Sequence, residues 1–423
     1  MKKSTFFVTI YMMKKICIIG GGAAGMMAAA TICQQQTKAE VTIIEKNALL
    51  GRKVIISGGG RCNVTTGMQD IRQVLTHYPR GNTFLATAMR RFPPNAVIHW
   101  FESHGVPLKT EKDLRVFPQS NNGKDIVTVF EQLYKKSRVT VRLQTTVESI
   151  KKEQRVFHII LKDGSFLKAE AVILATGGTA YRNTGSTGDG YAFAKTLGHT
   201  LTPIAPSLNA LTLAEHWPKK LAGLSLPHIA LQTKRAKTIL WKGAMIFTHT
   251  GISGPAVFAF SSLIAFEKFD HQNPLPIFID FLPETPFAQI EYIVRQETQL
   301  HPAIFFKNTI HRFLPTTLCE VLCQELQIDL KKRNAEVSKK ELHYAIQWIK
   351  RCSLHIVARS NGTEFITAGG VNLKEINPKT MESRLCPGLF FAGEILNIDG
   401  FTGGFNLQAA WATGKLAGES ACQ

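Results

Sequence analysis

The stretch KICIIGGGAAGMMAAATICQQQ, residues 15–36, constrains the fold of this chain more than any other. It opens with a continuous apolar run, which is typical of a strand buried on both faces of a parallel sheet. Small residues then lead into apolar residues at helical spacing without proline, which predicts a helix. A second apolar run, VTIIEK at 41–46, predicts another buried strand. Together these segments predict a βαβ unit and a mainly parallel α/β fold.

Three glycines between the first strand and the helix follow the pattern G-x-G-x-x-G. Gly20 permits a tight turn, Gly22 lets the backbone approach a pyrophosphate, and Gly25 allows the helix to pack closely on the strand. The helix N-terminus offers unpaired N–H groups to the phosphates. Glu45, 20 residues beyond Gly25, can accept both ribose hydroxyls of an adenosine and would repel a 2′-phosphate. The predicted dinucleotide site also includes Ala23, Ala24 and Lys46. Plain packing of strand and helix is the alternative interpretation.

A second glycine-rich stretch, SGGGRCNVTT at 57–66, indicates FAD rather than NAD. A flavin lies far from the adenine end of its cofactor, so FAD needs a second support that NAD does not. Consecutive glycines let backbone amides approach that distant half without a clash of side chains. The basic pair Arg52 and Lys53, just before the loop, can offset phosphate charge.

Composition and charge exclude several classes of protein. The chain has 423 residues, enough for two or three domains, and no apolar run reaches the length needed to span a bilayer. Its eight cysteines include no CxxC pair and no cluster at zinc spacing, so we expect neither a metal site nor a disulfide framework. The N-terminus lacks the features of a signal peptide, which favours a cytoplasmic location. The true start could be Met12 or Met13.

The formal net charge of +19 suits an anionic partner. The basic residues are dispersed and not interleaved with aromatic residues, so surface solvation is the simpler explanation. We therefore expect no nucleic-acid partner, although an RNA-associated protein stays an alternative.

Later segments predict three domain pieces. From residue 138 the sequence alternates as a β-meander, with a tight turn at Asp163-Gly164, and it leads into a buried strand at 171–178. We expect residues 13–198 and 353–423 to form one nucleotide-binding domain. The inserted domain then covers 199–352, with a β-rich part at 199–282 and a helical part at 283–352.

Several ordered motifs now carry a family resemblance. Residues 14–420 resemble one bacterial family. The motifs that carry the resemblance are GGGAAG, GRKVIISGGGRCNVTT, LRVFPQS, TGSTGDGYAFAKTLGH, FTHTGISGPAVF, ITAGGVNLKEINPKTMESR and GLFFAGEILNIDGFTGGFNLQAAWATG. It contains the bile-acid-inducible flavoprotein and the aminoacetone oxidase-like proteins, described as NAD(P)/FAD-dependent oxidoreductases. The resemblance implies a glutathione-reductase-like FAD-binding Rossmann domain with an inserted β-barrel-like and helical domain. Thr66 departs from the asparagine usual in the family.

The resemblance also implies which residues surround the cofactor. It places the second glycine loop beside FAD and the start of the last helix at the pyrimidine edge of the flavin, where the helix dipole would stabilise a reduced flavin. Asp399 is the expected partner of ribityl hydroxyls or phosphate-bound water, and Val147 is the expected adenine contact. The remaining expected contacts are Ser57, Gly58, Gly59, Cys62, Asn63, Thr176, Gly177, Gly178, Gly393, Glu394, Gly404, Phe405, Asn406 and Leu407.

The leading functional prediction is an FAD-dependent oxidoreductase that moves hydride or electron pairs between a small organic substrate and the flavin. The catalytic residue stays unassigned. His249 in the insert and Cys62 beside the flavin are candidates, although each also suits a structural role. No second dinucleotide motif is present, so NAD(P)H could act only as a transient co-substrate. Oxygen-driven oxidation of an amine, reduction of an enone-like substrate and a non-catalytic flavin-binding protein stay open.

Overall fold

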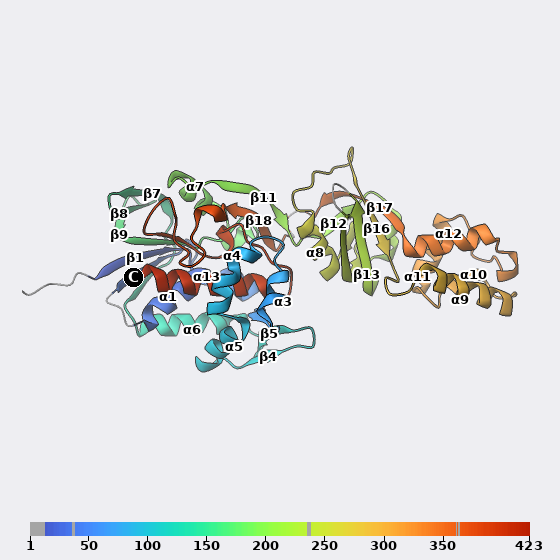
Figure 1. The fold of residues 1–423 in the computed structure, drawn as a ribbon, viewed down its shortest axis with the longest axis horizontal. Helices are drawn as coiled ribbons and strands as arrows, with labels where there is room; N and C mark the ends of the chain where they lie inside the picture. The colour runs from blue at the N-terminus through green and yellow to red at the C-terminus, as the bar shows by residue number, and fades with distance from the viewer. Residues whose placement is uncertain (1–12, 36–38, 235–237, 361, 363) are drawn as a thin grey trace, which may run out of the picture. The chain divides into compact units, whose positions relative to one another are not determined.

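The computed structural model describes residues 13–35, 39–234, 238–360, 362 and 364–423. Met12, one candidate start, and the predicted helix end at Gln36 lie outside these residues. The chain divides into two compact units. Unit 1 comprises residues 1–205 and 366–423, and unit 2 comprises residues 206–365 (Figure 1). The chain thus leaves unit 1, builds unit 2 and returns.

A five-stranded parallel sheet forms the centre of unit 1. Its strand order is β19-β10-β1-β2-β6, from β1 (Lys14–Ile19), β2 (Ala39–Ile44), β6 (Val139–Arg142), β10 (Ala171–Leu174) and β19 (Leu389–Phe391). Every neighbouring pair is parallel. The apolar run at 16–19 is buried, as expected for a strand covered on both faces.

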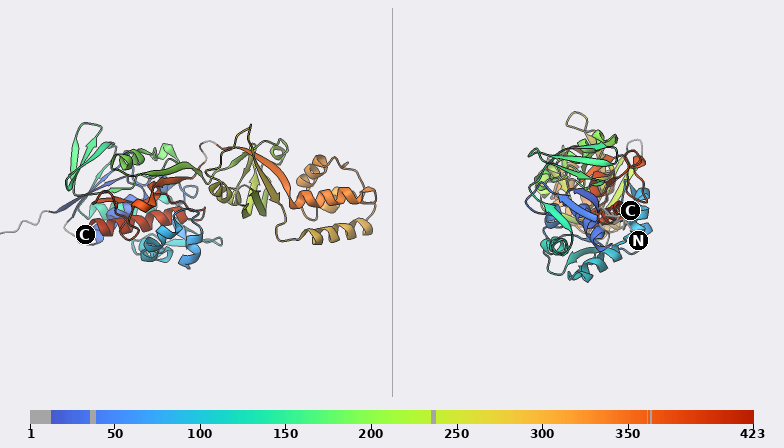
Figure 2. Two further views of the ribbon diagram at one scale, coloured as in Figure 1. Left: turned by 45° about the horizontal axis from the view of Figure 1, so that its top comes forward. Right: turned by 90° about the vertical axis from the view of Figure 1, so that its left-hand side faces the viewer.

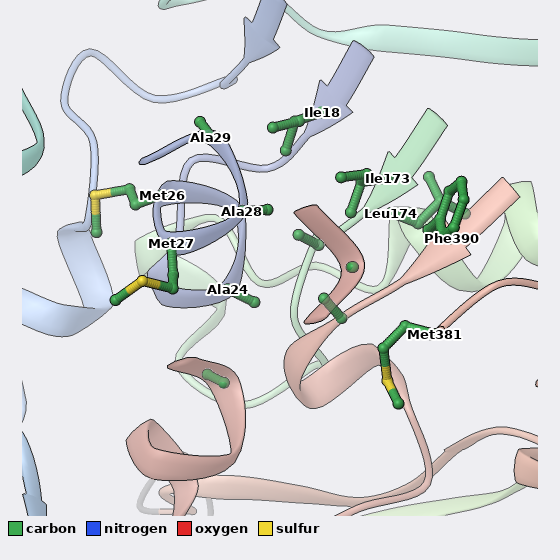
Figure 3. Packing of buried hydrophobic residues seen from close by; sticks show 14 of the residues in the cluster. Ile18, Ala24, Met26, Met27, Ala28, Ala29, Ile173, Leu174, Met381 and Phe390 are labelled. Carbon is green, nitrogen blue, oxygen red and sulfur yellow. The ribbon is translucent and has the colours of Figure 1, made fainter. Parts of the chain in front are cut away.

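Helix α1 (Ala23–Gln34) packs on β1 and β2 and against the last helix, α13 (Phe405–Ala421), which itself contacts β10 and β19. Small residues let the two helices approach closely. A Cβ on Gly414 would lie 2.3 Å from the carbonyl oxygen of Ala24, and one on Gly418 would lie 2.6 Å from that of Ala28. In Figure 3, Ala28 faces Ile173 on β10, whereas the methionines of α1 lie on the other side of the helix. The alanine-rich sequence of α1 is therefore explained by packing.

Further elements surround the sheet of unit 1 (Figures 1 and 2). An antiparallel meander comprises β7 (Val147–Glu153), β8 (Val156–Leu161) and β9 (Phe166–Ala169). A second small sheet has the order β3-β5-β4, and β11 (Leu201–Ser207) pairs with β18 (Ile366–Val371). The other named elements are β3 (Thr65–Thr66), β4 (Leu108–Thr110), β5 (Arg115–Pro118), α2 (Arg52–Ile56), α3 (Ile71–Thr76), α4 (Asn82–Arg91), α5 (Pro94–Ser103), α6 (Gly123–Lys135) and α7 (Asp189–Thr196).

Unit 2 is a closed six-stranded barrel with a group of helices inserted between its strands, most of them between β16 and β17. The barrel order is β12-β15-β14-β13-β16-β17, and both barrel and helices share one apolar core. The strands are β12 (Leu211–Leu213), β13 (Ser225–Lys234), β14 (Thr238–Phe247), β15 (Gly251–Ser253), β16 (Leu275–Asp280) and β17 (Cys352–Arg359). The helices are α8 (Pro255–Leu263), α9 (Phe287–Leu300), α10 (Phe306–Ile310), α11 (Thr316–Glu325) and α12 (Lys339–Lys350).

The structure corrects two expectations about local organisation. Strand β6, which we expected to open the meander, is instead the edge strand of the parallel sheet, because helix α6 returns the chain to lie beside β2. The expected bounds of the insert, 199–352, also differ from those of unit 2. Strand β17 closes the barrel, and β11 pairs within unit 1 before the chain crosses over. The division consequently falls at 205/206 and 365/366.

Candidate functional site

Four chain segments converge at the carboxyl edge of the parallel sheet in unit 1. Each follows one of the strands β1, β2, β10 and β19, and parallel strands end at the same edge. Backbone hydrogen bonds continue beyond the strands: Gly20 N donates to Ile44 O at 2.9 Å, and Ala392 N donates to Leu174 O at 3.0 Å. The segments therefore hold Gly20, Glu45, Thr176 and Gly393 close together. This edge is where open α/β sheets bind ligands.

The N-terminus of helix α1 faces open space at this edge. Its cap is Gly22, which has extended backbone, and no side chain accepts a hydrogen bond from the first turn. That turn contains no acidic residue, so the positive end of the helix dipole is not neutralised there. A Cβ on Gly22 would meet nothing within 4 Å, whereas one on Gly25 would lie 1.9 Å from the carbonyl oxygen of Gly20. Ala23 and Ala24 are the first residues of this turn, and an open helix N-terminus of this kind attracts anions.

Glu45 lies at the mouth of the glycine loop and is largely buried. One carboxylate oxygen accepts the Gly21 N–H at 2.8 Å, and the other accepts the backbone and side-chain N–H groups of Asn47. A carboxylate has about four acceptor positions, so one is free for a ribose hydroxyl. The neighbouring Lys46 forms an ion pair with Asp189 at 2.7 Å. Although burial opposes it, hydrogen bonds from Lys46 and Thr187 lower the pKa of Asp189.

Val147 is buried at the start of β7. Thr145 N, two residues before it, donates to the backbone carbonyl of Glu45 at 3.0 Å. The adenine contact expected for Val147 stays a prediction.

The basic residues before the second glycine loop have different environments. Lys53 Nζ donates to Glu394 Oε2 at 2.8 Å, with both side chains mostly buried. Arg52 is exposed and donates to the side chain of Asn47 at 3.3 Å. The second oxygen of Glu394 accepts the Thr367 N–H at 2.9 Å. Glu394 is therefore held directly beside the loop that follows β10, since a Cβ on Gly178 would lie 3.0 Å from Oε1 of Glu394.

The second glycine loop is exposed at Gly58, Gly59 and Gly60 but buried just beyond them. Cys62 is fully buried, and burial raises the pKa of its thiol to about 12. A protonated thiol is a poor nucleophile, so these surroundings favour packing over a catalytic role for Cys62. Ser57 caps helix α2 and donates to Val54 O at 2.8 Å. Asn63 accepts the Val116 N–H at 3.3 Å.

Two buried hydroxyl groups next to the loop after β10 lack a hydrogen-bond partner among the described residues. They are Thr176 Oγ1 and Tyr191 OH. Burial raises the pKa of Tyr191, and the charge of Glu394 adds to the effect, so the phenol stays protonated and can donate. Buried polar atoms normally have partners, and unpartnered ones beside an open helix N-terminus fit a polar ligand. Gly177 lies between this threonine and Gly178 with a positive φ of 73°.

Asp399 has a role that the sequence analysis did not foresee. It is completely buried, and both of its carboxylate oxygens accept hydrogen bonds from the guanidinium of Arg80. This pair joins the loop before α13 to the turn at 77–81, which favours an architectural role over the expected ribityl contact. A partner for Asp399 was foreseeable because a buried carboxylate needs one, but its identity was not.

The N-terminus of α13 is built like that of α1. Gly404 caps it with no side-chain hydrogen bond, and its first turn contains no acid. A Cβ on Gly404 would lie 2.2 Å from Thr65 O, so the helix start is pressed against β3. Phe405 is buried and stacks on His77 at 4.3 Å between ring centroids. Asn406 accepts the Gly400 N–H at 2.8 Å, and the partly buried Leu407 packs on the core.

His249 belongs to unit 2, unlike every other predicted site residue. It lies in the exposed turn between β14 and β15, where Thr248 Oγ1 accepts the Gly251 N–H at 3.1 Å. Its catalytic role stays a prediction.

These features fit FAD better than a mononucleotide. The first helix N-terminus lies at the glycine loop held by Glu45, and unit 1 also contains a second glycine loop and a second acid-free helix N-terminus, more than a mononucleotide needs. The class defined by this fold and site is a Rossmann-type FAD-binding protein.

The chain belongs to the HI0933-like family, whose Rossmann domain matches residues 14–420. It is 32 % identical over 393 residues to the 3-dehydro-bile acid delta(4,6)-reductase of Clostridium scindens, covering 91 % of this chain and 93 % of that protein. It is 32 % identical over 391 residues to the ribosomal RNA dihydrouridine synthase of Escherichia coli, covering 89 % and 91 %. The corresponding enzyme of Haemophilus influenzae is 30 % identical over 384 residues, covering 88 % and 90 %.

Solved structures share the fold at low sequence identity. A 3-ketosteroid-delta4-(5alpha)-dehydrogenase from Rhodococcus jostii RHA1 has a TM-score of 0.51 at 15 % identity, with 98 % of each chain covered. A mutant of the quinol fumarate reductase subunit FrdA from E. coli has a TM-score of 0.51 at 16 % identity, covering 97 % of this chain and 70 % of that one. The chain is an FAD-dependent oxidoreductase, which confirms the predicted fold class, cofactor and enzyme class.

The described residues lack a membrane-spanning helix and a metal-binding cluster. No helix there has the length and hydropathy needed to cross a bilayer. Likewise, no cluster of three or more His, Cys, Asp or Glu side chains there could hold a metal ion.

Proposed function

We propose that this protein reduces a carbon–carbon double bond conjugated to a carbonyl group. The proposal is supported by what the names of two relatives have in common. The bile-acid relative is named for 4,6-unsaturation in a 3-dehydro acid, where a double bond is conjugated to the ketone. A dihydrouridine synthase saturates the double bond of uracil that is conjugated to a ring carbonyl. In each case one hydride adds to the carbon remote from the carbonyl and one proton adds to its neighbour.

The structural observation that carries the proposal is that two acid-free helix N-termini and two glycine loops all belong to unit 1. FAD, when bound, supplies the hydride. The α1 turn and Lys53 would hold the charged middle of the cofactor, and Glu45 would hold its ribose. The α13 N-terminus would stabilise negative charge on the flavin ring after reduction, which favours electron acceptance from a donor.

Anaerobic flavin reoxidation tests the reaction class. The FAD-loaded protein is reduced chemically and mixed with a steroid 4-en-3-one, with its saturated 3-ketone and with a primary amine. We expect the enone alone to reoxidise the flavin and to gain two hydrogens by mass spectrometry. Reoxidation only after oxygen is admitted would overturn the proposal and favour an oxidase.

RNA uracil is a second candidate substrate, and the charge of unit 1 favours it. That unit has 32 Lys and Arg against 18 Asp and Glu, whereas unit 2 has 18 against 13. Most of the positive charge therefore lies on the unit that would bind the flavin. Incubation with unmodified ribosomal RNA and a reductant should yield dihydrouridine in nuclease digests. Its absence, with active enone reduction, would leave a small-molecule substrate.

Three finer assignments complete the proposal. NADH or NADPH would reduce the flavin by transient binding, which stopped-flow mixing measures directly. His249 would supply the substrate proton, so His249→Ala should retain FAD but slow turnover. The protein would act in the cytoplasm, since reducing compartments preserve thiols such as those of Cys17, Cys62 and Cys323.

A further inference from the structure

The outer face of the β7–β9 meander carries a regular arrangement of basic and aromatic side chains. Strand register places Lys151 opposite His158, and His158 opposite Lys168, in one row across three strands. The adjacent row on the same face ends with Ile160 opposite Phe166. The other face is buried: Ile150, Phe157, Ile159 and Leu161 all belong to the core of unit 1. Only the outer face is free to bind a partner.

Phe166 is the centre of this face. It is 59 % exposed although it is a large apolar residue. The His158 ring stacks beside it at 6.4 Å with an interplanar angle of 23°, and Lys168 Nζ lies 6.0 Å from its ring centroid. These contacts hold the phenylalanine on the surface and leave much of the ring accessible.

The meander that carries Phe166 has a net positive charge. Residues 147–169 contain five Lys and Arg against three Asp and Glu. Within the described chain, Lys151, Arg155, Lys162 and Lys168 form no ion pair with an acid. Glu153 lies beside this row, with its carboxylate 3.5 Å from His158 Nε2. The positive charge here is therefore available to an external anion.

We propose that this face, defined by Lys151, His158, Phe166 and Lys168, binds unpaired nucleotides of an RNA. An exposed aromatic side chain on an antiparallel sheet can stack on a base, and flanking lysines can contact the phosphates. A basic phosphate-binding surface without the aromatic would not distinguish single strands from duplexes. The proposal rests on the second candidate substrate above, RNA uracil, and assigns the recognition of that RNA to a surface of unit 1.

Fluorescence anisotropy with a labelled uridine-rich single strand tests the surface without catalysis. For the full-length, FAD-loaded protein we expect Phe166→Ala to weaken binding about tenfold, the scale of one lost base stack. Phe166→Tyr should restore most of it. Lys151→Ala and Lys168→Ala should each reduce the salt slope of log K by about 0.7, the value for one phosphate contact of a single strand.

Matched variants on helix α12 provide the control. Lys340 Nζ lies 5.6 Å from the ring centroid of Tyr344, which is 45 % exposed, so the same chemistry occurs there on a helix. Lys340→Ala and Tyr344→Ala should leave RNA binding unchanged. Equal affinity of the wild type and Phe166→Ala would overturn the proposal, as would equal binding of single strand, duplex and heparin. If RNA binds through this face but neither enone nor uridine reoxidises the flavin, the proposed reaction fails and the surface stands.

Discussion

The two glycine loops of unit 1 look alike in sequence but are constrained by different physical forces. Each contains three consecutive glycines, at 20–22 and at 58–60. In the first loop, a Cβ on Gly20 would lie 2.5 Å from the carbonyl oxygen of Ala175, and one on Gly21 would lie 2.4 Å from the side chain of Leu50. In the second loop, a Cβ on Gly59 or Gly60 would meet nothing within 4 Å.

The two loops also differ in backbone conformation. Gly59 and Gly60 have φ values of 72° and 85°, in the left-handed region that side chains disfavour. Gly22 has a φ of −80°, which any residue adopts. The first loop therefore excludes side chains through tertiary contact, joined at Gly20 by a φ of 106°, or, at Gly22, to leave room for a ligand. The second loop excludes them through conformation alone at Gly59 and Gly60, whereas a Cβ on Gly58 would also lie 2.9 Å from the ring of Phe117. Four substitutions can break or sharpen this distinction.

The largest effect is expected for Gly25→Ala. Its new Cβ would lie 1.9 Å from a backbone oxygen that cannot move without displacing β1. We expect a loss of at least about 3 kcal/mol in the free energy of unfolding, with loss of bound FAD. Urea denaturation followed by circular dichroism measures it. A stable, yellow Gly25→Ala protein would show that contact does not constrain this loop.

Gly22→Ser tests whether the open space beside Gly22 is needed for binding FAD or for the stability of the fold. Serine suits a helix N-cap at least as well as glycine, so the free energy of unfolding of the FAD-free protein should stay within about 0.5 kcal/mol. Its Cβ would occupy the open space where the pyrophosphate is proposed to lie. We therefore expect FAD affinity to fall about a hundredfold, close to 3 kcal/mol, in fluorescence titrations. Unchanged affinity would place the phosphates elsewhere.

The sequence was sufficient for the parts of the molecule that depend on local pattern. Buried apolar runs, glycine spacing and the acid at position 45 predicted the Rossmann core and its cofactor class. It was insufficient where partners are remote in the chain. The Arg80–Asp399 pair joins residues 319 positions apart, and no local pattern specifies it. Strand β6 was misassigned because alternation describes an exposed edge strand of a parallel sheet as well as a meander strand.

Glu45→Ala should have an intermediate effect, because this carboxylate holds the first loop and is also proposed to bind the ribose of FAD. It removes the acceptor of the Gly21 N–H and of Asn47, as well as the proposed ribose contact. We expect FAD to bind more weakly by about 1–3 kcal/mol, the scale of hydrogen bonds to a charged group. Isothermal titration with FAD is the measurement, and Glu40→Ala, at an exposed acid on β2, the strand that Glu45 follows, is the control. Equal affinities for both variants would remove the ribose assignment.

The smallest effect is expected for Gly60→Ala in the second loop. The new methyl group meets no atom, so only the left-handed backbone should matter, at a cost of about 1 kcal/mol in the free energy of unfolding. Gly60→Asn should cost less, because asparagine tolerates this conformation better. Thermal unfolding of both variants resolves the difference. If alanine and asparagine cost the same and both abolish FAD binding, the space above Gly60 is needed by the cofactor, and the two loops are constrained alike after all.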